Sequence, residues 1–300
     1  MEEQFKCNLC GNRHSRKIPF RYWFKKRHIY AVKCGYCGLI VLHPRPTDHE
    51  IDEMYRAEYF TEEDVQTHHY SEDYLTAVAR VDYGAKVDEV RHLLPEGGSV
   101  LEVGCATGEL LNAFKTAGYH VTGVEISSFA AEHARKNYQL NIIQTPFTKE
   151  QTGNQLKAES FDLVMMGDVL EHFTNPLDAL RYAHSLLKPG GVCIVHVPST
   201  LNLISTRLAF LLYRMTGTQK TMTIPPYHLT EFFPDTLKRS FHEAGFSQCR
   251  IRQETKHPKT IALRHSRLEN FAKVATQYPN YWLTKWFGIF GDRLTGVGRK

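Results

Sequence analysis

The feature that most constrains the fold is an alternation of apolar runs and helix-like segments that begins at residue 99. The apolar runs lie at 99–104, 120–126, 140–144, 161–168 and 191–199. Most of them are followed by a segment with the apolar spacing or the end signals of a helix. Alternation of this kind predicts an α/β fold, a parallel sheet with helices on both faces. Ligands of such sheets bind at the carboxyl ends of the strands.

The first strand-to-helix bend, "LEVGCATGELL" at 101–111, predicts a site for a small molecule. Gly104 ends the strand and Gly108 opens the helix, so a ligand can approach bare backbone and unpaired N–H groups. Glu125, at the end of the second strand, can accept both hydroxyls of a ribose. Ala106 stands where a dinucleotide loop would need a glycine, and Glu102 suits a cation. S-adenosylmethionine (SAM) has a ribose, an ammonium and a sulfonium, and no phosphate.

Four motifs in order, "LEVGCATG", "VEIS", "FDLVMMGDVLEHFTNPLDAL" and "LLKPGGVCIVHVPS", resemble those of class I SAM-dependent methyltransferases over about residues 85–250. The resemblance implies a Rossmann-like, seven-stranded α/β fold. It also implies a donor site whose loops hold the methionine part, the ribose and the adenine. The implied donor-site residues are Glu102, Gly104, Cys105, Ala106, Thr107, Gly108, Glu125, Ile126, Thr145, Pro146, Phe147, Asp168 and Val169.

Four of the seven cysteines form two C-x-x-C pairs near the start of the chain: Cys7, Cys10, Cys34 and Cys37. Each pair can direct two thiolates to one tetrahedral ion, so we expect residues 1–45 to form a zinc ribbon with a structural Zn²⁺. A redox pair is the alternative. Disulfides are not expected, because no secretory signal is visible and a cytoplasmic location is expected.

Residues 1–45, the head, are strongly basic. They carry ten Lys or Arg against two Glu, which leaves −3 for the rest of a chain whose formal net charge is +5. An anionic partner for the head is one interpretation, and a solvated surface is the other.

The remaining chain divides into 46–98, a linker with helices that include one over about 74–94, and 99–300, the methyltransferase domain. Within the latter we expect 200–232 to cover the substrate. The helix expected at 201–217 could instead touch a membrane surface. A further helix is expected at about 264–278 and a last strand near 290–298. The aromatic residues between them suggest a homodimer contact or a membrane-facing patch.

Transfer to an oxygen or carbon acceptor needs a base, most often histidine. The candidates are His172, just beyond the fourth strand, and His228, after the fifth. For His172 a purely structural hydrogen bond is the alternative. Tyr227 and Glu231 flank His228 and could bind a polar acceptor, whereas we expect His196 to be a packed strand residue.

The leading interpretation is methylation of a small molecule. The segments "CGLIVLHPRPT" and "YHLTEFFPDTLKRSFHEAGF" resemble a ribbon-bearing subgroup that acts on sugars, nucleotide-linked sugars or other small metabolites. Two alternatives stay open, an RNA methyltransferase with the ribbon as clamp and a non-catalytic SAM-binding module. A nucleic-acid partner is disfavoured, because "GDVLEH" stands where base-methylating enzymes carry N/D-P-P-Y/F, and the "PPY" at 225–227 is out of position.

Overall fold

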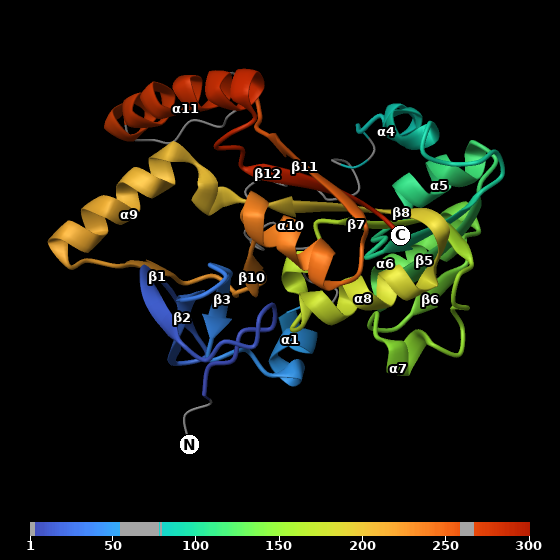
Figure 1. Cartoon of the computed structure of the whole chain (residues 1–300), viewed down its shortest axis with the longest axis horizontal. Helices are drawn as coiled ribbons and strands as arrows, with labels where there is room; N and C mark the ends of the chain where they lie inside the picture. Colours follow the sequence, from blue (N-terminus) through green and yellow to red (C-terminus); the bar gives the residue numbers. More distant parts are fainter. Residues whose placement is uncertain (1–3, 55–77, 79, 259–266) are drawn as a thin grey trace.

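The computed structural model describes residues 4–54, 78, 80–258 and 267–300. Its larger sheet has seven strands in the order β11-β12-β8-β7-β4-β5-β6 (Figure 1). The strands are β4 (Ser99–Val103), β5 (His120–Glu125), β6 (Ile142–Gln144), β7 (Phe161–Gly167), β8 (Leu187–Pro198), β11 (Gln248–Glu254) and β12 (Arg293–Arg299). Strands β4 to β8 are parallel, and β12 runs antiparallel between β8 and β11. The predicted Rossmann-like seven-stranded fold is confirmed.

Helices cover both faces of this sheet because its strands are apolar on both sides. The helices are α4 (Tyr83–Arg91), α5 (Glu109–Thr116), α6 (Ser128–Tyr138), α7 (Lys149–Thr152), α8 (Pro176–Leu186) and α10 (Pro234–Glu243). Val100 of β4 packs in one core cluster with Val87 of α4 and Phe114 of α5. Its neighbour Leu101 belongs to the opposite cluster, with Leu180 of α8. This two-residue alternation holds the carboxyl end of β4 between two packed layers.

The head forms a second sheet, in the order β10-β3-β2-β1-β9. Its own strands are β1 (Ser15–Phe24), β2 (Arg27–Cys34) and β3 (Ile40–His43), and β9 (Lys220–Met222) and β10 (Thr230–Glu231) come from the predicted insertion. Strand β9 pairs with β1 and β10 with β3, so both edges of the head sheet are covered. The insertion at 200–232 thus completes the head. None of its residues lines the large cavity described below. That this segment covers the substrate stays a prediction.

Among the described residues, three further helices lie outside the main layers. Helix α1 (Asp48–Met54) follows the head, whereas α9 (Ile204–Thr216) and α11 (Arg267–Phe287) contact each other at one end of the molecule (Figure 1). Helix α11 continues past Pro279 and is longer than predicted. Among the described residues, no helix combines the length and apolar character needed to cross a bilayer.

Helix α4 is shorter than the helix expected at 74–94, part of which lies outside the described residues. It begins after Asp82, whose side chain accepts a hydrogen bond from Ala85 N–H. The cap places Val81 before the helix, where it is exposed, and Val87 is the residue of α4 that is buried in the core. The local capping signal therefore decided the boundary, and not the apolar spacing.

Candidate active site

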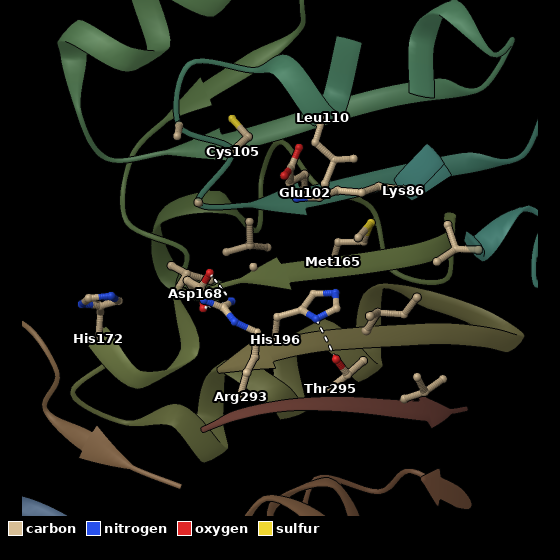
Figure 2. Close-up of a pocket in the computed structure, with 18 of the residues that line it drawn as sticks. Lys86, Glu102, Cys105, Leu110, Met165, Asp168, His172, His196, Arg293 and Thr295 are labelled. Atoms are coloured by element: carbon tan, nitrogen blue, oxygen red, sulfur yellow. Dashed lines mark hydrogen bonds and ion pairs between the residues drawn. The ribbon is translucent and has the colours of Figure 1, made fainter. Parts of the chain in front are cut away.

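A cavity of about 2260 Å³ lies at the carboxyl ends of the parallel strands (Figure 2). Loops after β4, β5, β6 and β7 form one part of its wall, and β11, β12 and α11 form another. Pockets for single small ligands usually have volumes of about 300–1,000 Å³. This cavity is therefore large enough for a donor and an acceptor together.

The bend after β4 brings bare backbone to the cavity. Gly104 has φ +69°, and a Cβ there would lie 2.7 Å from Cγ2 of Val169. Neither the backbone conformation nor the space admits another residue without strain. Ala106, in the same bend, also has a positive φ of 46°.

Glu125, at the end of β5, is fixed by two backbone donors. Its Oε2 accepts a hydrogen bond from Ala106 N–H at 2.9 Å, and its Oε1 accepts one from Ser127 N–H at 2.8 Å. Burial raises the pKa of this carboxyl, and the two N–H groups oppose that rise. The remaining lone pairs of the carboxylate are available to a diol in the cavity.

Glu102 is the second buried acid of the donor loop. Burial and then repulsion from Glu109 raise its pKa to about 8, with Lys86 acting in the opposite direction. Its Oε2 is buried and has no hydrogen-bond partner among the described residues. A buried carboxyl of this kind is stabilised in its charged form by a nearby cation.

A second cluster forms where β7 ends. The side chain of Glu171 is 1% exposed, and neither oxygen has a hydrogen-bond partner in the part of the chain that the structure describes. Its Oε1 lies 3.7 Å from His172 Nε2 and 3.9 Å from His228 Nε2, and the two rings are 5.0 Å apart. The backbone oxygen of Tyr227 lies 2.9 Å from His172 Nδ1. In the His172 ring, Nδ1 therefore faces the Tyr227 backbone and Nε2 faces Glu171.

Burial sets the protonation states of this cluster. It raises the pKa of Glu171 well above its usual value, and repulsion from Asp168 adds to the rise. Burial, followed by repulsion from His228, lowers the pKa of His172 to about 3. Burial also lowers the pKa of His228, which Asp168 opposes. Both rings are therefore neutral near pH 7.

The same cluster could hold a divalent cation. Glu171, His172 and His228 each offer one metal-ligand atom, and these three atoms lie within 4.8 Å of one another.

Comparison with known proteins identifies the family. A family model described as a methyltransferase domain matches residues 70–249, which is more than half of the chain. The chain belongs to this methyltransferase family. It is a SAM-dependent methyltransferase.

Two curated relatives are ubiquinone biosynthesis O-methyltransferases. The protein of Actinobacillus pleuropneumoniae serotype 5b (strain L20) is 32% identical over 142 residues, covering 45% of this chain and 58% of the relative. That of Xanthomonas campestris pv. campestris (strain B100) is 38% identical over 126 residues, covering 41% and 49%. The methyltransferase thus spans about half the length of the curated relatives it matches.

Solved structures similar to this methyltransferase include a SAM-dependent methyltransferase from Archaeoglobus fulgidus, with 20% identity and a TM-score of 0.48 over 72% of this chain and 92% of the other. Another is a SAM-dependent methyltransferase from Thermotoga maritima described as a possible histamine N-methyltransferase. It has 24% identity and a TM-score of 0.47 over 74% and 91%.

The structure brings most of the predicted donor residues of the methyltransferase to the cavity wall. They are Glu102, Gly104, Cys105, Ala106, Glu125, Ile126, Thr145, Pro146, Phe147, Asp168 and Val169. Thr107 and Gly108 do not line it. The buried Thr107 hydroxyl donates to Glu109 at 2.6 Å, and a Cβ on Gly108 would meet Leu140 and Ala134 at 2.7 and 2.8 Å.

The residues predicted around the acceptor are divided between two places. His172 lines the cavity, whereas His228, Tyr227 and Glu231 do not. Glu231 belongs to β10, which pairs with β3 of the head. Glu231 Oε1 accepts a hydrogen bond from Leu201 N–H at 2.8 Å, and burial raises the pKa of Glu231 to about 7.

Sequence reasoning missed the cavity residues of β12, among them Arg293 and Thr295. Nη1 of Arg293 lies 2.7 Å from each carboxylate oxygen of Asp168, and Thr295 Oγ1 lies 3.0 Å from His196 Nδ1 (Figure 2). His196, expected to be packed away, therefore faces the cavity. The last strand of the chain is inserted beside β8, with Thr295 opposite His196 in the register. No local sequence signal indicates that pairing.

The four predicted zinc ligands come together in the head of the methyltransferase. Sγ of Cys7 lies 3.5 Å from Sγ of Cys37, and Sγ of Cys10 lies 3.5 Å from Sγ of Cys34. All four sulfurs lie within 4.8 Å of one another, and none of the seven cysteines forms a disulfide. Four sulfurs at about 2.3 Å from one ion would be roughly 3.8 Å apart. The cluster fits a tetrahedral Zn²⁺.

Proposed function

We propose that this methyltransferase transfers the methyl group of SAM to an oxygen of a small molecule, a sugar or a nucleotide-linked sugar, with a histidine as general base. The observation that carries the proposal is the Glu171–His172–His228 cluster, which presents a neutral imidazole to the cavity. The name of the curated relatives, O-methyltransferases, supports oxygen as the acceptor atom.

The chemistry balances with one base. The acceptor oxygen attacks the methyl carbon in line with the C–S bond, that bond breaks, and S-adenosylhomocysteine leaves as a neutral thioether. The hydroxyl proton passes to an imidazole Nε2. The imidazolium then faces the Glu171 carboxyl, which lies within 4 Å of both rings. Burial keeps this carboxyl neutral at rest, and the new positive charge beside it favours its ionised form. Glu171 thereby stabilises the charged base, and the half-exposed His228 can return the proton to water.

Basic side chains on the cavity wall favour an acceptor that carries phosphate. Arg293 and Arg252 are paired with Asp168 and Glu254. In contrast, Arg250 and Lys256 also line the cavity and make no ion pair with any described residue. Unpaired guanidinium and ammonium groups suit a phosphate or diphosphate.

The rival proposal, an RNA methyltransferase, rests on the basic head. Part of that charge is already neutralised, because Lys25 pairs with Glu53 and Arg27 with Glu50, both on α1. Arg45 donates to the backbone oxygen of Thr174 and joins the head to the body. These contacts reduce the charge left for an RNA backbone, so the small-molecule acceptor is favoured.

The test is methyl transfer from labelled SAM to a panel of nucleotide-linked sugars, sugar phosphates, polyphenols and total RNA. The proposal expects label on a sugar-containing small molecule, and loss of transfer in His172→Asn or His228→Asn protein that still binds SAM. Label on RNA alone would contradict it in favour of the rival. SAM binding without transfer to any acceptor class would support a non-catalytic module.

A further inference from the structure

The surface formed by α9 and α11 carries many exposed apolar side chains. On α9, the exposed side chains are Leu208, Leu211, Leu212 and Met215, whose spacing places them on one helical face. On α11 and just beyond it, they are Val274, Tyr278, Trp282, Trp286, Phe287 and Ile289. Met215, Trp286 and Phe287 are 75%, 66% and 68% exposed. We call these ten side chains the α9/α11 surface.

The two helices form one unit. They contact each other at one end of the molecule (Figure 1), and Asn280 Oδ1 of α11 accepts a hydrogen bond from Ile204 N–H of α9 at 3.1 Å. The rings of Trp282 and Trp286 lie 4.7 Å apart, and Lys285 Nζ lies 5.4 Å from the Trp282 ring. Exposed tryptophans beside a lysine are typical of side chains at a membrane–water interface.

An exposed apolar surface most often binds either a second copy of the chain or a membrane, and the charges on this surface distinguish the two. The charged residues within 204–222 and 274–291 are Arg207, Arg214, Lys220 and Lys285, and neither stretch contains an Asp or Glu. In a twofold dimer through this surface the same basic side chains would face each other. An anionic lipid surface, in contrast, complements both the basic and the apolar side chains.

We propose that the α9/α11 surface binds the methyltransferase peripherally to anionic lipid bilayers. Helix α11 links this surface to the reaction site, because Tyr281, Thr284, Lys285 and Gly288 line the cavity while Trp282 and Trp286 do not. One helix therefore separates the bilayer from the cavity, and binding places the cavity at the lipid surface. The inference is independent of the acceptor proposed above.

The test is co-sedimentation of the full chain with phosphatidylcholine vesicles, with and without phosphatidylglycerol. We expect binding that requires phosphatidylglycerol and weakens with salt. The variant Met215→Ser/Trp286→Ser/Phe287→Ser should lose at least about tenfold in vesicle affinity, because it removes the three most exposed apolar side chains of this surface. Tyr36→Ser, an equally exposed aromatic change in the head, should bind like the wild type. SAM affinity, measured by calorimetry, should be unchanged in both.

The proposal is wrong if the triple variant binds vesicles as tightly as the wild type. It is also wrong if neither vesicle binds the wild type and sedimentation velocity shows a dimer that the triple variant lacks, because the surface would then be an interface between two copies.

Discussion

Glu125 and Ala106 are joined by a hydrogen bond of 2.9 Å from the Ala106 backbone N–H to Glu125 Oε2. The bond ties the end of β5 to the bend after β4, joining residues that are 19 positions apart. It orients the carboxylate before any ligand is present, so a ribose diol would meet a fixed acceptor. The same side chain therefore shapes the donor loop and, in this account, binds the donor.

The donor loop should tolerate a side chain poorly at Gly108. Gly108 and Gly118 share a φ of +91°, but a Cβ on Gly108 would meet Leu140 and Ala134, whereas one on Gly118 would meet nothing within 4 Å. Gly118→Ala should therefore cost about 1–2 kcal/mol of unfolding free energy from backbone strain alone. Gly108→Ala should cost roughly 1–3 kcal/mol more because of overpacking. Urea denaturation of both variants measures the difference, and equal losses would contradict the packing argument.

Glu102 should make the protein less stable as the pH rises. Its pKa is about 8 in the folded chain against 4.5 for an ordinary glutamate, because burial disfavours its charge. The folded state therefore holds more protons than the unfolded state between these values, and wild-type stability falls across that range. Glu102→Gln removes this contribution. The variant should gain on the order of a few kcal/mol relative to wild type between pH 5 and about 8. A pH-independent difference in unfolding free energy would show that Glu102 does not titrate as described.

The head should contain one zinc ion per chain. Cys37→Ser removes one of four converging sulfurs, so it should lose the zinc and lower the melting temperature. Cys249→Ser is the matched control, since Cys249 is half-buried and does not belong to the cluster. Elemental analysis of protein purified without chelator checks both. Equal zinc content in the two variants, or none in the wild type, would exclude a zinc site built from these four cysteines.

The pH profile of the reaction should show no titration of a histidine near its ordinary pKa. Burial lowers the pKa of His172 to about 3, so this ring stays neutral from mildly acidic to basic pH, and burial also lowers the pKa of His228 from its usual value. The profile of kcat/KM should therefore show no inflection near 6.5. His172→Asn or His228→Asn should lower kcat by about 10²–10⁴-fold with SAM affinity retained. An inflection near 6.5 that disappears in one of the variants would instead assign an ordinary pKa to that ring.

Local signals predicted the fold and the donor site well. Apolar runs fixed β4, β5, β7 and β8 to within a residue or two, apart from an earlier start to β8, and the glycines and acids at strand ends marked the cavity wall. The paired cysteines predicted their own convergence, since a C-x-x-C turn directs both sulfurs to one point.

Local sequence signals could not predict which strands pair when they are distant in the chain. The contact between Arg293 and Asp168 depends on inserting the last strand beside β8, and the docking of β9 and β10 depends on open sheet edges formed by residues near the start of the chain. The contact between the His228 and His172 rings follows from the same docking. Only the folded chain reveals these relationships, because each joins segments whose own sequences carry no mark of the partner.

The most direct test of the account is the affinity for SAM, measured by titration calorimetry on wild-type, Glu125→Ala and Glu132→Ala proteins. Glu132 is an exposed acid on α6 and serves as the control. The account predicts one SAM per chain, at least a roughly tenfold weaker affinity for Glu125→Ala because two charged hydrogen bonds to the ribose are lost, and no change for Glu132→Ala. Equal SAM affinity in all three proteins, or no binding to the wild type, would contradict it.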